Sequence, residues 1–150
     1  MSAVGIRHTA IVVHSLETVL PFYRDLLGLN VVADFKEQTE YVQSVTGVHG
    51  ANIWTVNLKT ADGATIQLQQ YLSHPQDACL PRRGCDTGLN HIALQVDDID
   101  AIYTTLKAHG VPFTTPPLLS SQGIAKVTCC RDPEGVIIEL VEMIPTSAPL

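Results

Sequence analysis

Basic residues are scarce in this sequence of 150 residues. Nine Lys and Arg stand against 15 Asp and Glu, which gives a net charge of -6, and the Lys and Arg residues form no run. Nucleic acid and anionic membranes attract proteins through clustered positive charge. We therefore expect neither a nucleic acid nor a membrane as a partner.

Long apolar runs are also missing. No stretch approaches the roughly 20 apolar residues that a helix needs to cross a bilayer. The N-terminal residues show no basic region followed by an apolar run, which a secretory signal would require. We therefore expect a cytoplasmic protein.

The chain contains four cysteines. With 45% hydrophobic residues, a domain of this length can bury a core without disulfide bonds, so we expect reduced thiols. Cys79 and Cys85 flank one loop and could be bridged or bind a metal, but a single C-x5-C motif is a weak zinc signal. Cys129 and Cys130 are adjacent in a predicted strand and should therefore point to opposite faces.

The first half of the chain predicts the element order β, α, β, β, β. A β-branched segment at 7–14 leads to Ser15, which can cap a helix whose apolar side chains recur at helical spacing until Gly28. Pro21 lies inside this helix and has no N–H, so we expect a kink or a late helix start. Three strands are predicted to follow, at 29–35, 51–58 and 64–71.

The same order begins again at Leu89. We predict a strand at 89–96, a helix that Asp97 and Asp98 cap and that ends at Gly110, and strands at 111–115, 124–131 and 136–143. The second half therefore repeats the first. We predict an α+β fold with two tandem βαβββ modules in a single domain, with boundaries at about 6–71 for module 1, 72–88 for the linker and 89–143 for module 2.

Four polar side chains occupy equivalent positions of this repeat. His8 and His91 lie near the start of the first strand of their module, and Gln67 and Glu139 each lie four residues after a turn glycine in the last strand. A lone strand histidine is usually a core or surface residue. Glu139, however, lies in an apolar strand, where an unpaired buried carboxylate is costly. Since imidazole and carboxylate are ligands of divalent ions, we predict a metal site formed by His8, Gln67, His91 and Glu139.

Around these residues the sequence resembles the vicinal oxygen chelate superfamily, whose members include glyoxalase I (lactoylglutathione lyase), methylmalonyl-CoA epimerase, extradiol dioxygenases, fosfomycin-resistance thiol transferases and bleomycin-binding proteins. Glyoxalase I and the epimerase are the members closest in pattern. The resemblance runs from Ile6 to about Glu142 and rests on His8 and the segments 15–17, 22–29, 62–68, 89–94, 96–99 and 132–140.

The resemblance implies a half-barrel cavity that encloses the metal. His8, His91 and Glu139 match the ligand positions of the superfamily with the usual residue types, whereas Gln67 carries an amide where many members carry glutamate. Family resemblance also suggests a homodimer, and in some relatives modules from different chains share a site.

This ligand set favours chemistry on a small substrate with two chelating oxygens. A divalent ion (Zn, Ni, Co, Mn or Fe) held by one carboxylate and three neutral groups stays a strong Lewis acid, which can polarise a carbonyl and acidify the neighbouring C–H. Glu139 could accept that proton. We therefore favour a metal-dependent lyase or isomerase of glyoxalase or epimerase type, although Gln67 cannot supply the second base that an epimerase needs.

Two alternatives use the same fold differently. His8, His91 and Glu139 form the two-histidine, one-carboxylate set of an Fe(II)-dependent extradiol dioxygenase. A non-catalytic drug-binding protein would lack the metal ligands, so their presence counts against it. Phosphonate-directed thiol transfer is disfavoured because no cluster of lysines and arginines is present. We also predict a lid that contacts the substrate at 37–50.

Overall fold

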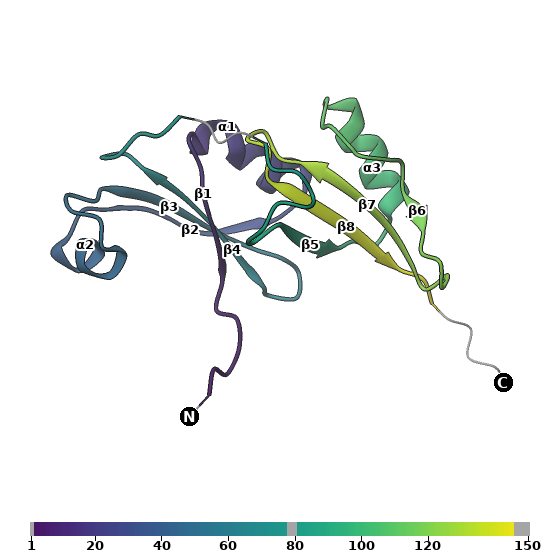
Figure 1. Cartoon of the computed structure of the whole chain (residues 1–150), viewed down its shortest axis with the longest axis horizontal. Helices are drawn as coiled ribbons and strands as arrows, with labels where there is room; N and C mark the ends of the chain where they lie inside the picture. Colours follow the sequence, from purple (N-terminus) through teal and green to yellow (C-terminus); the bar gives the residue numbers. More distant parts are fainter. Residues whose placement is uncertain (1, 78–80, 146–150) are drawn as a thin grey trace. The chain divides into compact units, whose positions relative to one another are not determined.

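The computed structural model describes residues 2–77 and 81–145, and the chain divides into two compact units, residues 1–78 (unit 1) and 79–150 (unit 2) (Figure 1). Cys79 lies outside the described residues. Within the described part of the chain, no helix combines the length and the apolar character that crossing a membrane would demand.

Unit 1 contains one mixed sheet of four strands in the order β1-β4-β3-β2. β1 runs parallel to β4, and the other neighbours are antiparallel. The elements of unit 1 are β1 (Thr9–Val12), α1 (Leu16–Pro21), the π-helix η1 (Phe22–Leu26), β2 (Asn30–Glu37), α2 (Glu40–Thr46), β3 (Ile53–Lys59) and β4 (Thr65–Tyr71).

Unit 2 repeats this topology with the strand order β5-β8-β7-β6 and a parallel β5–β8 pair. Its elements are β5 (His91–Gln95), α3 (Ile99–Ala108), β6 (Leu118–Leu119), β7 (Ala125–Arg131) and β8 (Ile137–Met143). The predicted α+β fold of two βαβββ modules is confirmed.

The two predicted helices, α1 and α3, begin at the caps that the sequence predicted. Ser15 Oγ accepts a hydrogen bond from the backbone N–H of Thr18 at 3.3 Å, and Asp98 Oδ1 accepts one from the N–H of Ala101 at 2.9 Å. Both caps satisfy donors that have no partner inside the helix.

The disturbance expected at Pro21 takes the form of a π-helix. α1 begins directly after its cap, so the late start was wrong. Because Pro21 has no N–H to donate, the α-helical pattern is interrupted, and the N–H of Leu27 bonds to the carbonyl of Phe22, five residues back, at 2.9 Å. The aromatic side chains of Phe22 and Tyr23 are both buried there.

One face of each sheet is covered by the helix of its unit. In unit 2, the buried Ile138 and Leu140 of β8 lie on the face next to α3, whose Leu106 is fully buried. Strand alternation then places Glu139 on the opposite face. Unit 1 follows the same rule: Ile66 is buried on the helix-covered face, and its neighbour in β4, Gln67, lies on the other.

The second strand of module 2 was predicted in the wrong place. The segment 111–115 forms only an isolated bridge between Phe113 and Cys130, and the edge strand is β6, at Leu118–Leu119. Pro112 precedes the bridge and Pro116 follows it. Because proline donates no hydrogen bond to a neighbouring strand, it interrupts pairing on both sides of Phe113.

The segment for which we predicted a lid contains α2, a helix that the sequence analysis missed. Thr39 caps it, and Gly47 ends it in the left-handed conformation at φ 69°. Val42 is buried against Ala51 and Ile53, so the helix is packed on β3 by a small apolar cluster. The helix has only seven residues and one buried position, so its sequence shows too little apolar periodicity for the helix to be predicted.

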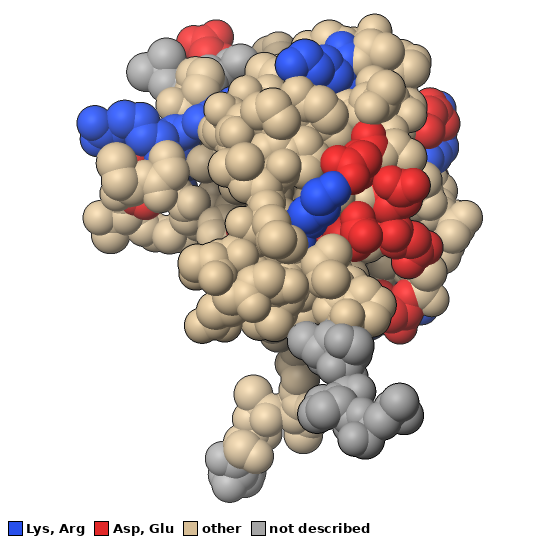
Figure 2. Space-filling model, turned by 90° about the vertical axis from the view of Figure 1, so that its right-hand side faces the viewer, with Lys and Arg blue, Asp and Glu red and all other residues tan. Residues whose placement is uncertain are grey.

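The positive charge of Lys126 in β7 is balanced by acidic neighbours. Its ammonium bonds to the carboxylate of Asp100, and this hydrogen bond raises the pKa of Lys126, with smaller contributions from Glu142 and Asp98. Figure 2 shows acidic side chains gathered beside a basic one on the face it draws. This lysine therefore offers little free positive charge to an anionic ligand.

Candidate metal centre

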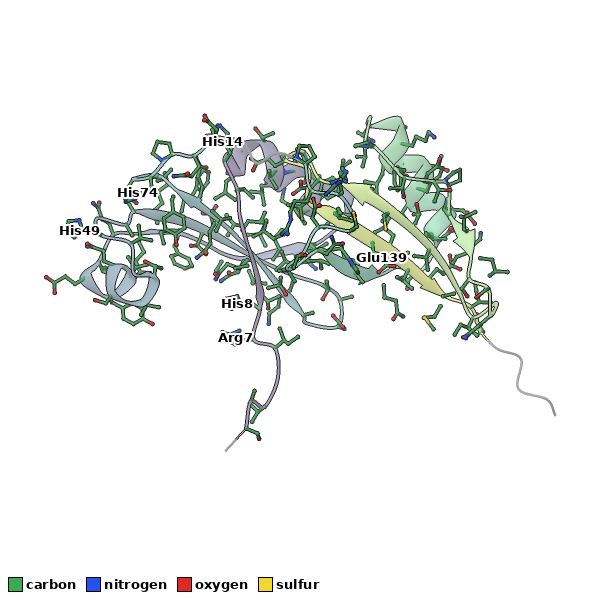
Figure 3. The ribbon with its side chains drawn as sticks, in the orientation of Figure 1. Arg7, His8, His14, His49, His74 and Glu139 are labelled. Carbon is green, nitrogen blue, oxygen red and sulfur yellow. The ribbon has the colours of Figure 1, made fainter. Side chains whose placement is uncertain are left out.

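His91 and Glu139 come together in unit 2 through the register of the parallel β5–β8 pair. His91 pairs with Ile137 and Ala93 pairs with Glu139, so the two side chains lie on the same face, two residues apart along the strands. His91 Nε2 lies 3.3 Å from Glu139 Oε2. Figure 3 labels Glu139 on β8.

The His91–Glu139 contact has a geometry that a metal site can use. The side chains are 45% and 28% exposed, so both remain accessible from solvent. Bonds of about 2.1 Å from one ion place adjacent ligand atoms about 3 Å apart, and the observed 3.3 Å is compatible with that spacing. The same contact is an ion pair when His91 is protonated.

Cys129 is the neighbour of Glu139 on the other side. The two residues pair directly between β7 and β8 and therefore share a face. Burial, and then the charge of Glu139, raise the pKa of the Cys129 thiol. We refer to His91, Cys129 and Glu139 as the site face of unit 2.

Cys130 points to the helix-covered side, where 1% of it is exposed. Burial, with smaller effects from Cys129 and Asp132, raises the pKa of its thiol to about 12. The prediction that the two adjacent cysteines lie on opposite faces is confirmed.

Unit 1 places His8 and Gln67 in the equivalent relation. Ala10 pairs with Gln67 across the parallel β1–β4 ladder, and His8 lies two residues before Ala10, as His91 lies two residues before Ala93. His8 directly precedes β1 and is exposed (Figure 3).

The amide of Gln67 is held by a residue that the sequence analysis missed. Gln67 Nε2 donates a hydrogen bond to Asn57 Oδ1 of β3 at 2.9 Å. Asn57 and Gln67 are register partners and, with Ala10, form what we call the site face of unit 1. Asn57 precedes Gln67 by the same ten residues that separate Cys129 from Glu139, so Asn57 and Cys129 hold equivalent places in the two modules.

The four predicted ligands thus form two pairs, one in each unit. Among residues 2–77 and 81–145, no three His, Cys, Asp or Glu side chains lie close enough together to hold a metal ion. Each unit supplies one histidine, and only unit 2 adds a carboxylate. Ligation by His8, Gln67, His91 and Glu139 therefore stays a prediction.

The remaining histidines are surface residues, as predicted. His14, His49, His74 and His109 are all exposed. His14 Nδ1 bonds to the carbonyl of Gln76, and His74 Nδ1 lies 2.8 Å from Ser73 Oγ. Figure 3 labels three of them, His14, His49 and His74.

Comparison with protein families gives the class of this chain. The model of the Glyoxalase/Bleomycin resistance protein/Dioxygenase superfamily matches residues 5–140. The match covers most of the chain, which therefore belongs to this superfamily. The family resemblance read from the sequence is confirmed.

Three individual proteins show how similar this chain is to members of known name or structure. A probable lactoylglutathione lyase from Vibrio cholerae serotype O1 is 29% identical over 142 residues, which are 95% of this chain and 93% of that protein. A solved glyoxalase family protein from Bacillus cereus is 24% identical, with a TM-score of 0.88 over 97% of both chains. A variant of glyoxalase I from Zea mays is 19% identical, with a TM-score of 0.68 over 95% of this chain and 46% of that one. The two structural likenesses concern the fold alone.

Proposed function

We propose that the protein is a divalent-metal-dependent lyase or isomerase, of glyoxalase or epimerase type, acting on a small carbonyl substrate with two chelating oxygens. The observation that carries the proposal is the 3.3 Å contact between His91 Nε2 and Glu139 Oε2. It brings an imidazole and a carboxylate, the residue types that divalent ions bind, to one accessible point on a rigid sheet.

Superfamily membership and the name of the relative from Vibrio cholerae support the choice of a lyase. The relative is similar over nearly its whole length, so the likeness is not limited to one shared module. We infer on the same grounds a single domain with modules at about 6–71 and 89–143, a cytoplasmic location and a homodimer.

The proposed chemistry assigns a separate task to each side chain. A bound divalent ion would supply Lewis acidity that makes the C–H next to a carbonyl easier to deprotonate. Glu139 is the sole carboxylate of the predicted set, so it would receive that proton and return it to the neighbouring atom. His91 would hold the ion beside Glu139 through Nε2, which lies 3.3 Å from Glu139 Oε2. Gln67 is neutral at all accessible pH values and would bind and orient without moving a proton.

The test combines metal analysis with a substrate panel. Purified protein loaded with Ni(II), Zn(II) or Co(II) is assayed on the hemithioacetal of an α-ketoaldehyde, on an acyl-CoA epimer and on a catechol. The proposal predicts turnover of one of the first two substrates, its loss on chelation, and its loss in His91→Ala but not in the exposed control His109→Ala. Equal turnover in His91→Ala and His109→Ala would contradict it.

A further inference from the structure

The amide of Gln67 has two chemically different ends, and only one of them can bind a metal ion. The carbonyl oxygen is a ligand, whereas the NH2 group is a pair of donors with no free lone pair to share. A glutamine ligand must therefore be turned so that its oxygen faces the ion. Something other than the metal has to hold the nitrogen.

Asn57 is placed to do this. Its Oδ1 accepts a hydrogen bond from Gln67 Nε2 at 2.9 Å, and both side chains are half-buried in adjacent antiparallel strands. Within the described residues, the amide oxygen Oε1 of Gln67 accepts no hydrogen bond. The β3–β4 ladder fixes the backbone of both residues, so the contact orients the amide without needing a flexible partner.

The second module supports this interpretation by contrast. Cys129 occupies the place opposite Glu139 that Asn57 occupies opposite Gln67. A carboxylate has no hydrogen to donate, and an acceptor such as the Asn Oδ1 would repel it. The chain instead puts a thiol, a weak donor, beside the carboxylate and an acceptor beside the amide. Each neighbour suits the hydrogen-bonding groups of the ligand it faces.

We propose that Asn57 is a positioning residue that turns the Gln67 amide so that Oε1 is available to a divalent metal ion. The inference rests on the proposed function, because it takes Gln67 to be a ligand. Partners that orient metal ligands typically contribute about 10- to 100-fold to metal affinity. For a single neutral hydrogen bond we expect the lower end, a loss of about 10-fold.

The experiment measures the dissociation constant of Co(II) by competition with a chromophoric chelator, with no assay of turnover. Asn57→Leu removes the acceptor and should weaken binding about 10-fold. Asn57→Asp keeps an acceptor at this place and should bind at least as tightly as the unmodified protein. Asn52→Leu, the same substitution at another half-buried position of unit 1, is the matched control and should leave the constant unchanged.

A double-variant cycle separates positioning from a general effect on the fold. In the Gln67→Ala background, Asn57→Leu should cause no further loss, because the amide it orients is gone. Asn57→Asp in the Gln67→Ala background measures the effect of the aspartate charge alone. The melting temperature of each metal-free variant reports whether it folds.

The outcomes distinguish this inference from the proposed function. If Gln67→Ala weakens Co(II) binding and Asn57→Leu does not, Asn57 has no positioning role although the ligand set stands. If Gln67→Ala itself leaves binding unchanged, Gln67 is not a ligand and the inference fails together with that part of the proposed site. Should Asn57→Leu not fold, Asn57→Asp decides: weaker binding in a folded Asn57→Asp variant, with its acceptor retained, would overturn the proposal.

Discussion

Glu142 Oε2 accepts a hydrogen bond from the backbone N–H of Ile99 at 2.9 Å, which ties the last strand of unit 2 to the first turn of α3. Gln70 repeats the contact in unit 1, where its Oε1 accepts from the N–H of Leu16 in α1 at 3.0 Å. Each of these residues lies three positions after a predicted metal ligand, an odd spacing that turns it to the helix side of the strand. One strand therefore carries the candidate ligand on one face and fixes the helix on the other.

Loss of these contacts should lower stability. Glu142→Ala leaves a helix N-terminal donor without its charged acceptor, and we expect the free energy of unfolding to fall by about 1 to 2 kcal/mol. Gln70→Ala removes a neutral acceptor and should cost about 0.5 to 1 kcal/mol. Urea denaturation measures both. The exposed control Gln38→Ala should change little, and a loss in Glu142→Ala no larger than in that control would show that the contact contributes nothing.

The two last-strand ligands should differ in their effect on activity. Glu139→Gln removes both the charge that would bind the metal and the proposed proton acceptor, so turnover should fall by about 100-fold or more. Gln67→Ala removes one neutral ligand and should reduce turnover less. Steady-state kinetics at saturating metal gives the ranking. A reversed ranking would mean that Gln67, rather than Glu139, dominates the site.

The cysteines should react with iodoacetamide in an order set by exposure and pKa. The thiolate is the reactive form, so a raised pKa slows alkylation at a given pH. At pH 8 we expect Cys85, which is exposed, to react first, Cys129 to react slowly, and Cys130, whose pKa burial raises to about 12, to react only after unfolding. As the pH rises towards 10, Cys129 should accelerate while Cys130 stays protected. Mass spectrometry of digested protein resolves the sites, and early labelling of Cys130 in folded protein would contradict the burial.

Dioxygen separates the favoured reaction class from the extradiol alternative. Deprotonation next to a carbonyl needs only a Lewis acid, so activity should persist in an anaerobic chamber and with Zn(II), Ni(II) or Co(II). An oxygen electrode provides the second measurement. Turnover of a catechol that consumes dioxygen and requires Fe(II) or Mn(II) would instead identify a dioxygenase with the same His8, His91 and Glu139.

The repeat made much of this structure predictable. Turn glycines, helix caps and strand patterns recur in both halves, so the element order and the caps at Ser15 and Asp98 could be predicted from local chemistry. α2 could not, because its stability depends on the packing of Val42 against residues that follow the helix in the chain. The edge strand β6 lies later in the chain than the predicted strand at 111–115, because prolines on both sides of Phe113 limit pairing there.

The residues of the candidate site could be predicted from the sequence, but the contacts that they make could not. His8, Gln67, His91 and Glu139 stand out by their equivalent places in the repeat. Their neighbours depend on the strand register, which brings Asn57 opposite Gln67 and Cys129 opposite Glu139. A single polar residue such as Asn57 in a strand carries no signal of its own until the partner strand is known.

Metal stoichiometry tests the central claim most directly. The purified protein is loaded with Zn(II) or Ni(II), freed of excess ion by gel filtration and analysed by mass spectrometry for bound metal, in parallel with Glu139→Ala, His91→Ala and the exposed control His109→Ala. The account predicts one bound ion per complete site in the unmodified protein and in His109→Ala, and a large loss in His91→Ala and Glu139→Ala. Equal metal content in all four proteins would show that His91 and Glu139 do not hold the ion.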